Sequence, residues 1–141
     1  MEEKNLAFSK KGDLTSEFYY KWGTNLESLF GEWENVNPIT VQISRVIMTS
    51  RDGEVYIRCF GQLEDGEQDW GEVPCQLFAD NVSSPVVEGF AGKYDMGFME
   101  VMIIGNIKYG TMVVQSYNTF KDGSKRSNYM GREFYRKLED K

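Results

Sequence analysis

Alternation of apolar and polar residues is clearest between Ser44 and Phe60. Successive side chains of a strand point to opposite faces, so an apolar residue at every second position predicts a strand with one buried face. Asp52-Gly53 interrupts the pattern at its midpoint, and this pair favours a two-residue type I′ turn, because both central positions need a positive φ. The stretch therefore predicts a β-hairpin. Its facing pairs are Arg51 with Glu54, Ser50 with Val55, Thr49 with Tyr56, Met48 with Ile57, Ile47 with Arg58, Val46 with Cys59, and Arg45 with Phe60.

The face that this register buries is small and apolar. Its residues are Val46, Met48, Val55, Ile57 and Cys59. The second cysteine, Cys75, also falls on an apolar face, beside Val73 and Leu77. We therefore expect both cysteines to be buried, unreactive thiols that behave as small hydrophobic side chains.

The same alternation recurs along the rest of the chain, between segments rich in turn-forming residues. The predicted strands are 31–35, 39–50, 54–60, 70–79, 86–94, 98–104, 107–120 and 127–138. The acidic stretch 61–69 has no periodicity and is predicted as a loop, and Gly105-Asn106 is predicted as a turn. Short connections favour an all-β, antiparallel up-and-down meander. Eight tilted strands can close into a barrel, which we favour over an open sandwich.

The segment before the first strand divides into two parts. Residues 1–12 are polar and rich in Lys and Glu, which predicts a mobile tail. Residues 13–30 predict a short helical arm or lid. A first helical piece is capped by Asp13 or Ser16 and stopped at Gly23, and Asn25 then caps one further turn that holds Leu26, Leu29 and Phe30. This arm carries too many apolar residues for a free tail, so we expect it to dock on the barrel or on a second chain. The barrel domain is predicted over 31–138.

The composition of the chain limits the classes of function that it can have. The chain has 141 residues, which suits one domain, and its net charge of −6 argues against nucleic-acid binding. The absence of histidine removes His-based catalysis and His-ligated metals, and two cysteines are too few for a Cys-rich zinc site. We expect no metal, no cofactor and no enzymatic activity. The N-terminus lacks a secretory leader and no run reaches the ~20 apolar residues of a membrane span, so we expect a soluble cytoplasmic protein.

Gly31-Glu-Trp33 follows a short helical turn and precedes the meander, and Arg132 lies in the last strand. This arrangement resembles the calycin pattern of lipocalins, fatty-acid-binding proteins and avidins. The resemblance implies a lipocalin-like barrel whose base is closed by Trp33 packing under Arg132, with Arg136 as the alternative partner.

Four internal motifs resemble a group of bacterial domains of unknown activity more closely. These motifs are Trp33-Glu-Asn35, Asp69-Trp-Gly71, Tyr94-Asp-Met-Gly-Phe98 and Phe120-Lys-Asp-Gly-Ser-Lys-Arg126 followed by Asn128-Tyr129. The similarity covers about 31–136 and implies no particular activity.

Two motifs offer candidate site residues. Asp69-Trp70 and Tyr94-Asp95 place carboxylates beside aromatic rings, as in an acid–base pair or a grip on a polar ligand. We favour the alternative that Asp69 and Asp95 bond to backbone donors at strand ends while Trp70 covers the rim of the core. Arg132 alternates with Met130 and Phe134, which predicts that all three face inward; Arg126 is predicted as a solvated turn residue.

Two functions fit this pattern. The first is binding of a small apolar or amphipathic ligand inside the barrel, with its anionic end near Arg132. The candidate ligand-binding residues are Trp33, Asp69, Trp70, Tyr94 and Arg132. This carrier needs Gly89 and Ala91 inside, because Phe90 and Tyr94 would fill the barrel. The alternative is a structural or interaction module with a filled barrel, whose aromatic arm contacts a partner or forms a homodimer. Catalysis through Asp69, Asp95 or Glu100 lacks a nucleophile motif.

Overall fold

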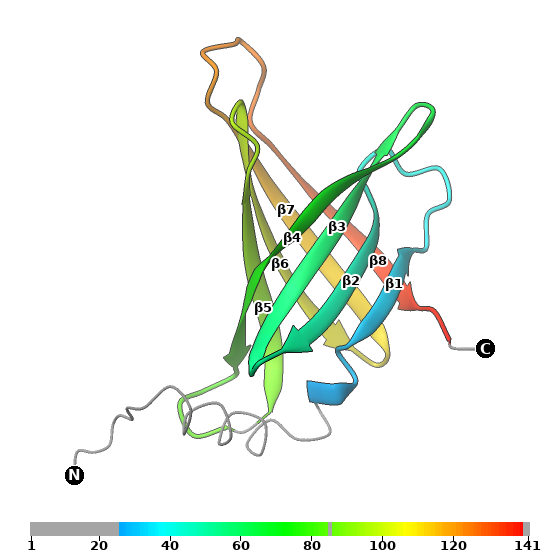
Figure 1. The fold of residues 1–141 in the computed structure, drawn as a ribbon, viewed down its shortest axis with the longest axis vertical. Helices are drawn as coiled ribbons and strands as arrows, with labels where there is room; N and C mark the ends of the chain where they lie inside the picture. The colour runs from blue at the N-terminus through cyan, green and yellow to red at the C-terminus, as the bar shows by residue number, and fades with distance from the viewer. Residues whose placement is uncertain (1–25, 85, 140–141) are drawn as a thin grey trace.

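The computed structural model describes residues 26–84 and 86–139. Eight antiparallel strands pair in chain order and β1 also pairs with β8, so the sheet closes into a barrel (Figure 1). The strands are β1 (Gly31–Asn35), β2 (Ile43–Arg51), β3 (Glu54–Leu63), β4 (Gly66–Ala79), β5 (Val87–Asp95), β6 (Met99–Lys108), β7 (Thr111–Phe120) and β8 (Tyr129–Lys137). The predicted all-β meander and its closure are confirmed. No helix in the described ranges is long and apolar enough to cross a bilayer.

The hairpin of β2 and β3 has the predicted turn and register. Asp52 and Gly53 have φ values of 53° and 79°, as a type I′ turn requires. All seven predicted pairs form, from Arg51 with Glu54 to Arg45 with Phe60. The predicted inward face is buried along its whole length.

The predicted loop at 61–69 is wrong, because most of it is strand. Gly61 pairs with Gln68 and Leu63 with Gly66, so only Glu64 and Asp65 form the turn between β3 and β4. The acidic side chains of this stretch are compatible with a strand, because they do not enter the core. Glu67 forms an ion pair with Arg45, and Asp69 forms one with Arg58.

The predicted turn at Gly105-Asn106 is also wrong. Strand β6 continues through both residues, and the turn lies at Tyr109-Gly110, where φ is 54° and 79°. Gly105 faces inward, opposite Phe90. A Cβ added at Gly105 would overlap the Phe90 ring, so this glycine makes room for an aromatic side chain inside the sheet.

Large side chains fill the barrel. Strand β5 turns Phe90 and Tyr94 inward, where they are 1% and 3% exposed, so the alternative with Gly89 and Ala91 inside is excluded. Other fully buried side chains include Trp33, Met48, Met112 and Tyr135. A cavity beside Tyr135 holds only about 10 Å³, the lower limit for a single water molecule.

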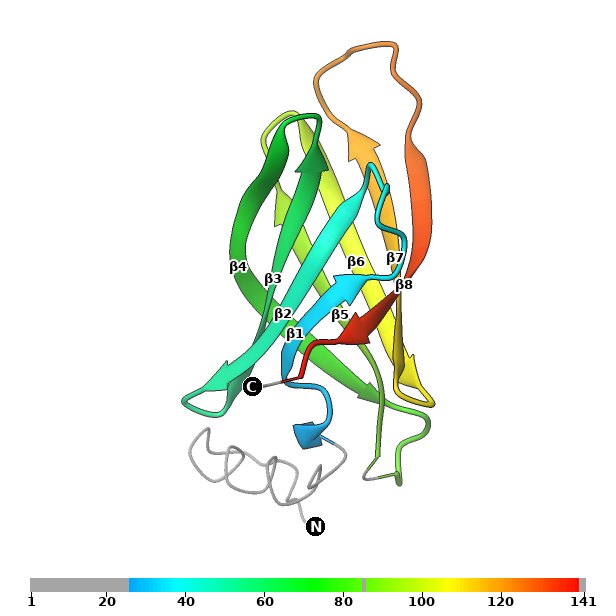
Figure 2. The ribbon, with the colours of Figure 1, turned by 90° about the vertical axis from the view of Figure 1, so that its right-hand side faces the viewer.

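One end of the barrel is closed by a single helical turn at 26–29 (Figure 2). Leu29 N–H donates to the Leu26 carbonyl at 3.0 Å, and both leucine side chains are buried in the core. Trp33 Nε1 donates to the Leu29 carbonyl at 3.0 Å, and Lys137 Nζ lies 5.7 Å from the Trp33 ring. The last part of the predicted arm therefore docks on the barrel; residues 1–12 and 13–25 lie outside the described ranges.

A buried polar network joins β1, β2 and β8. Asn35 Nδ2 donates to Glu133 Oε1 at 2.6 Å and to the Ile43 carbonyl at 3.0 Å. Thr40 Oγ1 donates to the same Glu133 oxygen at 2.7 Å, and the Tyr135 hydroxyl donates to the Ile43 carbonyl at 2.7 Å. These bonds hold the β1–β2 loop against β8 and explain Asn35 in the Trp33-Glu-Asn35 motif.

Candidate functional site

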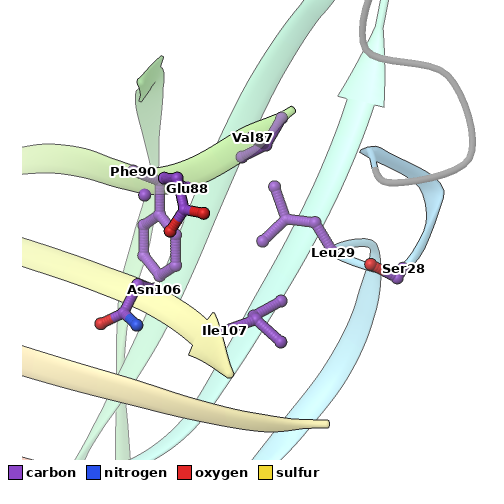
Figure 3. A pocket seen from close by; sticks show the side chains of 8 residues that line it. Ser28, Leu29, Val87, Glu88, Phe90, Asn106 and Ile107 are labelled. Carbon is purple, nitrogen blue, oxygen red and sulfur yellow. The ribbon is translucent and has the colours of Figure 1, made fainter. Parts of the chain in front are cut away.

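The closed end leaves little room for a ligand. Leu29 extends from the helical turn toward Val87 of β5 and Ile107 of β6 (Figure 3). The cavity at this position, lined also by Glu88 and Asn106, measures about 50 Å³. A cavity of that size admits only a few water molecules, so no space for a ligand remains beside the helical turn.

The opposite end of the barrel carries a larger, partly open cavity of about 90 Å³, which we name the mouth cavity. Its lining comes from the β1–β2 loop, β3, β4, β7 and β8. The lining residues with polar or aromatic side chains on which we build the candidate site are Gln42, Gln68, Trp70, Ser116, Asn118 and Tyr129. Its lining contains no charged side chain.

Trp70 lies on the wall of the mouth cavity because β3 has a glycine beneath it. A Cβ added at Gly61 would lie 2.7 Å from Trp70 Nε1, so only glycine lets the indole lie against the strand. The indole meets the Tyr94 ring edge-on, with ring centroids 5.4 Å apart and an interplanar angle of 76°. Within the described part of the chain, the Trp70 N–H donates no hydrogen bond.

Amide groups supply further hydrogen-bonding capacity at the mouth. Asn118 is buried, and its Nδ2 donates to Ser116 Oγ at 3.2 Å and to the Tyr129 carbonyl at 3.1 Å, which leaves Oδ1 as an acceptor. The Gln42 carboxamide lies where a side chain on Gly131 would otherwise be, and it forms no side-chain hydrogen bond within residues 26–84 and 86–139. Donors and acceptors of neutral groups therefore converge on one small space.

Tyr94 supports the mouth cavity from below. Its hydroxyl donates to the Gly71 carbonyl at 2.7 Å and accepts the Cys59 N–H at 2.9 Å. Burial raises the pKa of this phenol, so it stays protonated. The Tyr94 hydroxyl joins β3 to β4 and is already fully used within the protein.

Asp69 and Asp95 lie on the outside of the barrel, Asp69 within β4 beside a register irregularity and Asp95 at the end of β5. Asp69 accepts the Gly71 N–H at 2.9 Å and forms an ion pair with Arg58, which lowers the pKa of its carboxyl to about 2. Asp95 accepts the Gly97 N–H at 2.9 Å and pairs with Lys121 at 2.8 Å, which lowers its pKa as well. Both aspartates bond to backbone donors as predicted, but only Asp95 does so at a strand end, because Asp69 lies within β4.

The predicted inward position of Arg132 is wrong. Strand β8 turns Gly131, Glu133 and Tyr135 toward the interior, so Arg132 lies on the outer face with Met130 and Phe134. This register follows from β7, which pairs Gln115 with Arg132 while Val114 and Ser116 face inward.

The partner of Trp33 at the closed end is Lys137, whose Nζ also donates to the Ser28 carbonyl at 3.2 Å. The alternative Arg136 is exposed and pairs with Glu34 at 2.7 Å. Of the five predicted ligand-binding residues, the structure brings only Trp70 and the underlying Tyr94 together.

Sequence reasoning missed Gln42, Gln68, Ser116, Asn118 and Tyr129. A signal for two of them was present, because Ser116 and Asn118 continue the inward alternation of Met112 and Val114. Two polar residues at successive core positions near a strand end indicate a polar cavity.

The two cysteines are buried, as predicted, with exposed fractions of 0% for Cys59 and 8% for Cys75. Burial raises the pKa of each thiol to about 12, so neither forms a thiolate at neutral pH. In the described ranges no three acidic or cysteine side chains gather as metal ligands.

Comparison of the chain with protein families, with curated proteins and with solved structures found no match.

Proposed function

We propose that this protein binds a small, uncharged, hydroxyl-bearing ligand of the saccharide class in the mouth cavity. The observation that carries the proposal is the set of unused hydrogen-bonding groups there, on Trp70, Gln42 and Asn118, beside a lining without charge. A ligand with both hydroxyl donors and hydroxyl acceptors satisfies an indole N–H and two carboxamides together.

The aromatic side chains suit the same class of ligand. Trp70 presents an amphipathic ring on one wall, and Tyr129 presents another at the rim. Sugars combine apolar C–H faces with hydroxyl edges, so a ring face can lie against an aromatic wall while the edges reach the amides. A cavity of about 90 Å³ accepts part of a sugar ring, and its open side lets the rest extend into solvent.

An amphipathic anion inside the barrel fits less well. Phe90 and Tyr94 occupy the interior, and Arg132, which was expected to hold the anionic end, lies on the outer face. We therefore place the proposed ligand in the mouth cavity and not in the interior of the barrel. We also propose a distant relationship to the calycin barrels, which the Trp33–Lys137 contact beside the helical turn supports.

The proposal predicts saturable binding of at least one mono- or disaccharide from a panel titrated by isothermal calorimetry. Asn118→Ala removes a buried acceptor, and Gln68→Ala removes a rim amide that forms no side-chain hydrogen bond in the described part of the chain. Each variant should raise the Kd, by roughly tenfold for Asn118→Ala, as expected for one lost buried hydrogen bond. Thr119→Val, on the outer face beside Asn118, is the matched control and should leave the Kd unchanged.

Two outcomes would overturn the proposal: no saccharide binds the wild type, or Thr119→Val weakens binding as much as Asn118→Ala. A fluorescent fatty-acid probe completes the panel. Saturable binding of that probe, weakened by Arg132→Ala, would favour an amphipathic-ligand carrier instead.

A further inference from the structure

A row of aromatic rings leads from the mouth cavity along the rim of the barrel. Tyr129 lines the cavity, and its ring centroid lies 6.2 Å from that of Phe120. The Phe120 centroid in turn lies 6.5 Å from that of Phe98. Tyr129 is 48% exposed and Phe98 is 44% exposed, so both ends of this row, which we name the rim row, are open to solvent.

The rim row is built by three neighbouring segments at the open end of the barrel. Tyr129 pairs with the buried Asn118 at the start of β8, and Phe120 lies two residues beyond Asn118 on the same side of β7. Phe120 packs partly against the core. The Lys121 N–H donates to the Phe98 carbonyl at 2.8 Å, which joins the β5–β6 turn to the β7–β8 loop (Figure 2). The positions of the three rings therefore follow from backbone pairing.

The β7–β8 loop places Arg126 over the middle of the rim row. Its guanidinium carbon lies 4.2 Å from the Phe120 ring centroid and 5.6 Å from that of Phe98. Its Nη2 pairs with Asp122 at 2.7 Å, and its Nε donates to Ser124 Oγ at 3.3 Å. Within the described part of the chain its Nη1 donates no hydrogen bond. Because Asp122 balances the charge of Arg126, the pair adds hydrogen-bonding groups to the rim without adding net charge.

We propose that the ligand is a linear oligosaccharide, with one sugar unit in the mouth cavity and the following units over the rim row. This inference rests on the proposed function and extends it from the cavity to a second subsite. The cavity of about 90 Å³ holds only part of a sugar ring, so the rest of the ligand has to leave past its rim, where Tyr129 begins the row.

The chemistry of the rim row suits the units of a neutral saccharide. The exposed rings of Tyr129 and Phe98 offer apolar surfaces to the C–H faces of sugar units. Between these rings, the Arg126 guanidinium can donate to hydroxyl groups and the Asp122 carboxylate can accept from them. The rim row thus repeats the combination of aromatic rings and polar groups found in the mouth cavity.

Arginines also lie over aromatic rings on the outer face of β2 and β3, where Arg45 covers Phe60 and Arg51 covers Tyr56, each at 4.0 Å. Neither of those rings lines the mouth cavity. The rim row differs because its first ring, Tyr129, is itself part of the cavity wall. This continuity is the reason for assigning the rim row, and not the outer arginine–aromatic pairs, to the ligand.

The test is calorimetric titration of the full chain with three series of increasing length. The series are glucose, cellobiose and cellotriose; glucose, maltose and maltotriose; and N-acetylglucosamine, chitobiose and chitotriose. In at least one series the Kd of the trisaccharide should be at least roughly tenfold below that of the monosaccharide, because the added units gain ring contacts and hydrogen bonds.

Two variants assign this gain to the rim row. Phe98→Ala removes the outermost ring, and Arg126→Gln removes the guanidinium donors at a side chain that is 54% exposed. Each should bring the trisaccharide Kd most of the way back toward the monosaccharide Kd. Phe78→Ala is the matched control, because Phe78 is 46% exposed at the far end of β4, and it should keep the full gain.

Equal Kd values for the mono- and trisaccharide in every series that binds would overturn this inference and leave the proposed function standing. A gain that persists in both Phe98→Ala and Arg126→Gln, or that Phe78→Ala removes as well, would overturn it too, provided that circular dichroism shows the variants folded. If the wild type binds none of these saccharides, the inference and the proposed function both fall.

Discussion

Asp69 shows how a residue that looks catalytic in the sequence can be used for structure. Its neighbours Trp70 and Gly71 suggest a site, yet its carboxylate points away from Trp70 toward Arg58 and bonds to the Gly71 N–H. Adjacent residues of a strand face opposite sides, so Asp69 lies outside because Trp70 lies inside. The motif therefore positions Trp70 at the mouth cavity, and the aspartate bonds to Gly71 at the irregularity of β4, where φ of Gly71 is 85°.

The depressed pKa of Asp69 gives a prediction for its titration. Its folded value of about 2 lies below the usual value near 4, so its ionised form contributes stability above pH ~4. That contribution is lost as the pH falls from about 4 through 2. In Arg58→Gln the Asp69 midpoint, followed by carboxyl NMR, should rise toward 4.

Asp95 is the internal control for this titration, because its pKa is lowered by Lys121 instead. Its midpoint should stay the same in Arg58→Gln. An Asp69 midpoint that also stays near 2 in this variant would show that Arg58 is not the cause of the depression.

At the scale of the element, the sequence predicts strands well where a turn motif and alternation agree. The Asp52-Gly53 hairpin has both signals, and its register is confirmed pair by pair. The predicted turn was wrong where a glycine is required by packing between strands and not by a turn. Gly105 looked like a turn residue, yet it sits in β6 because Phe90 needs its space, and this contact between strands is invisible in the local sequence.

The prediction of which face of strand β8 lies inside was wrong for a different reason. Its apolar residues Met130 and Phe134 were expected inside, but they are exposed on the outer face of the barrel. Alternation identifies two faces of a strand without saying which of them is buried. Glu133 then faces inward, where Asn35 and Thr40 satisfy one of its carboxylate oxygens.

The close packing of Gly105 and Phe90 predicts a specific energetic coupling. Gly105→Ala should lower the free energy of unfolding by about 1–3 kcal/mol, because the added methyl group overpacks the core. In a Phe90→Leu background the same substitution should cost clearly less, since the smaller side chain leaves room. Urea unfolding of the four proteins measures both values. Equal costs in the two backgrounds would contradict the assignment of Gly105 as space for the ring.

At the scale of the whole molecule, the barrel has differentiated ends and sides. The helical turn and Trp33 close the base, Phe90 and Tyr94 fill the interior, and the open end gathers uncharged polar groups around Trp70. The closed barrel was predictable from eight alternating segments with short turns. The mouth cavity was not, because its residues come from separate strands and loops that only the closure of the sheet brings together.

The most direct test of the proposed function is the indole N–H signal of Trp70 in a ¹⁵N-labelled sample, assigned with Trp70→Phe and titrated with the saccharide panel. Trp70 lines the mouth cavity with an unused donor, whereas the Trp33 N–H is bonded to Leu29 at the closed end and serves as the internal control. The account predicts a saturable shift of the Trp70 signal, with the Trp33 signal unmoved. A Trp70 signal that stays constant with every saccharide, or that moves only together with Trp33, would contradict it.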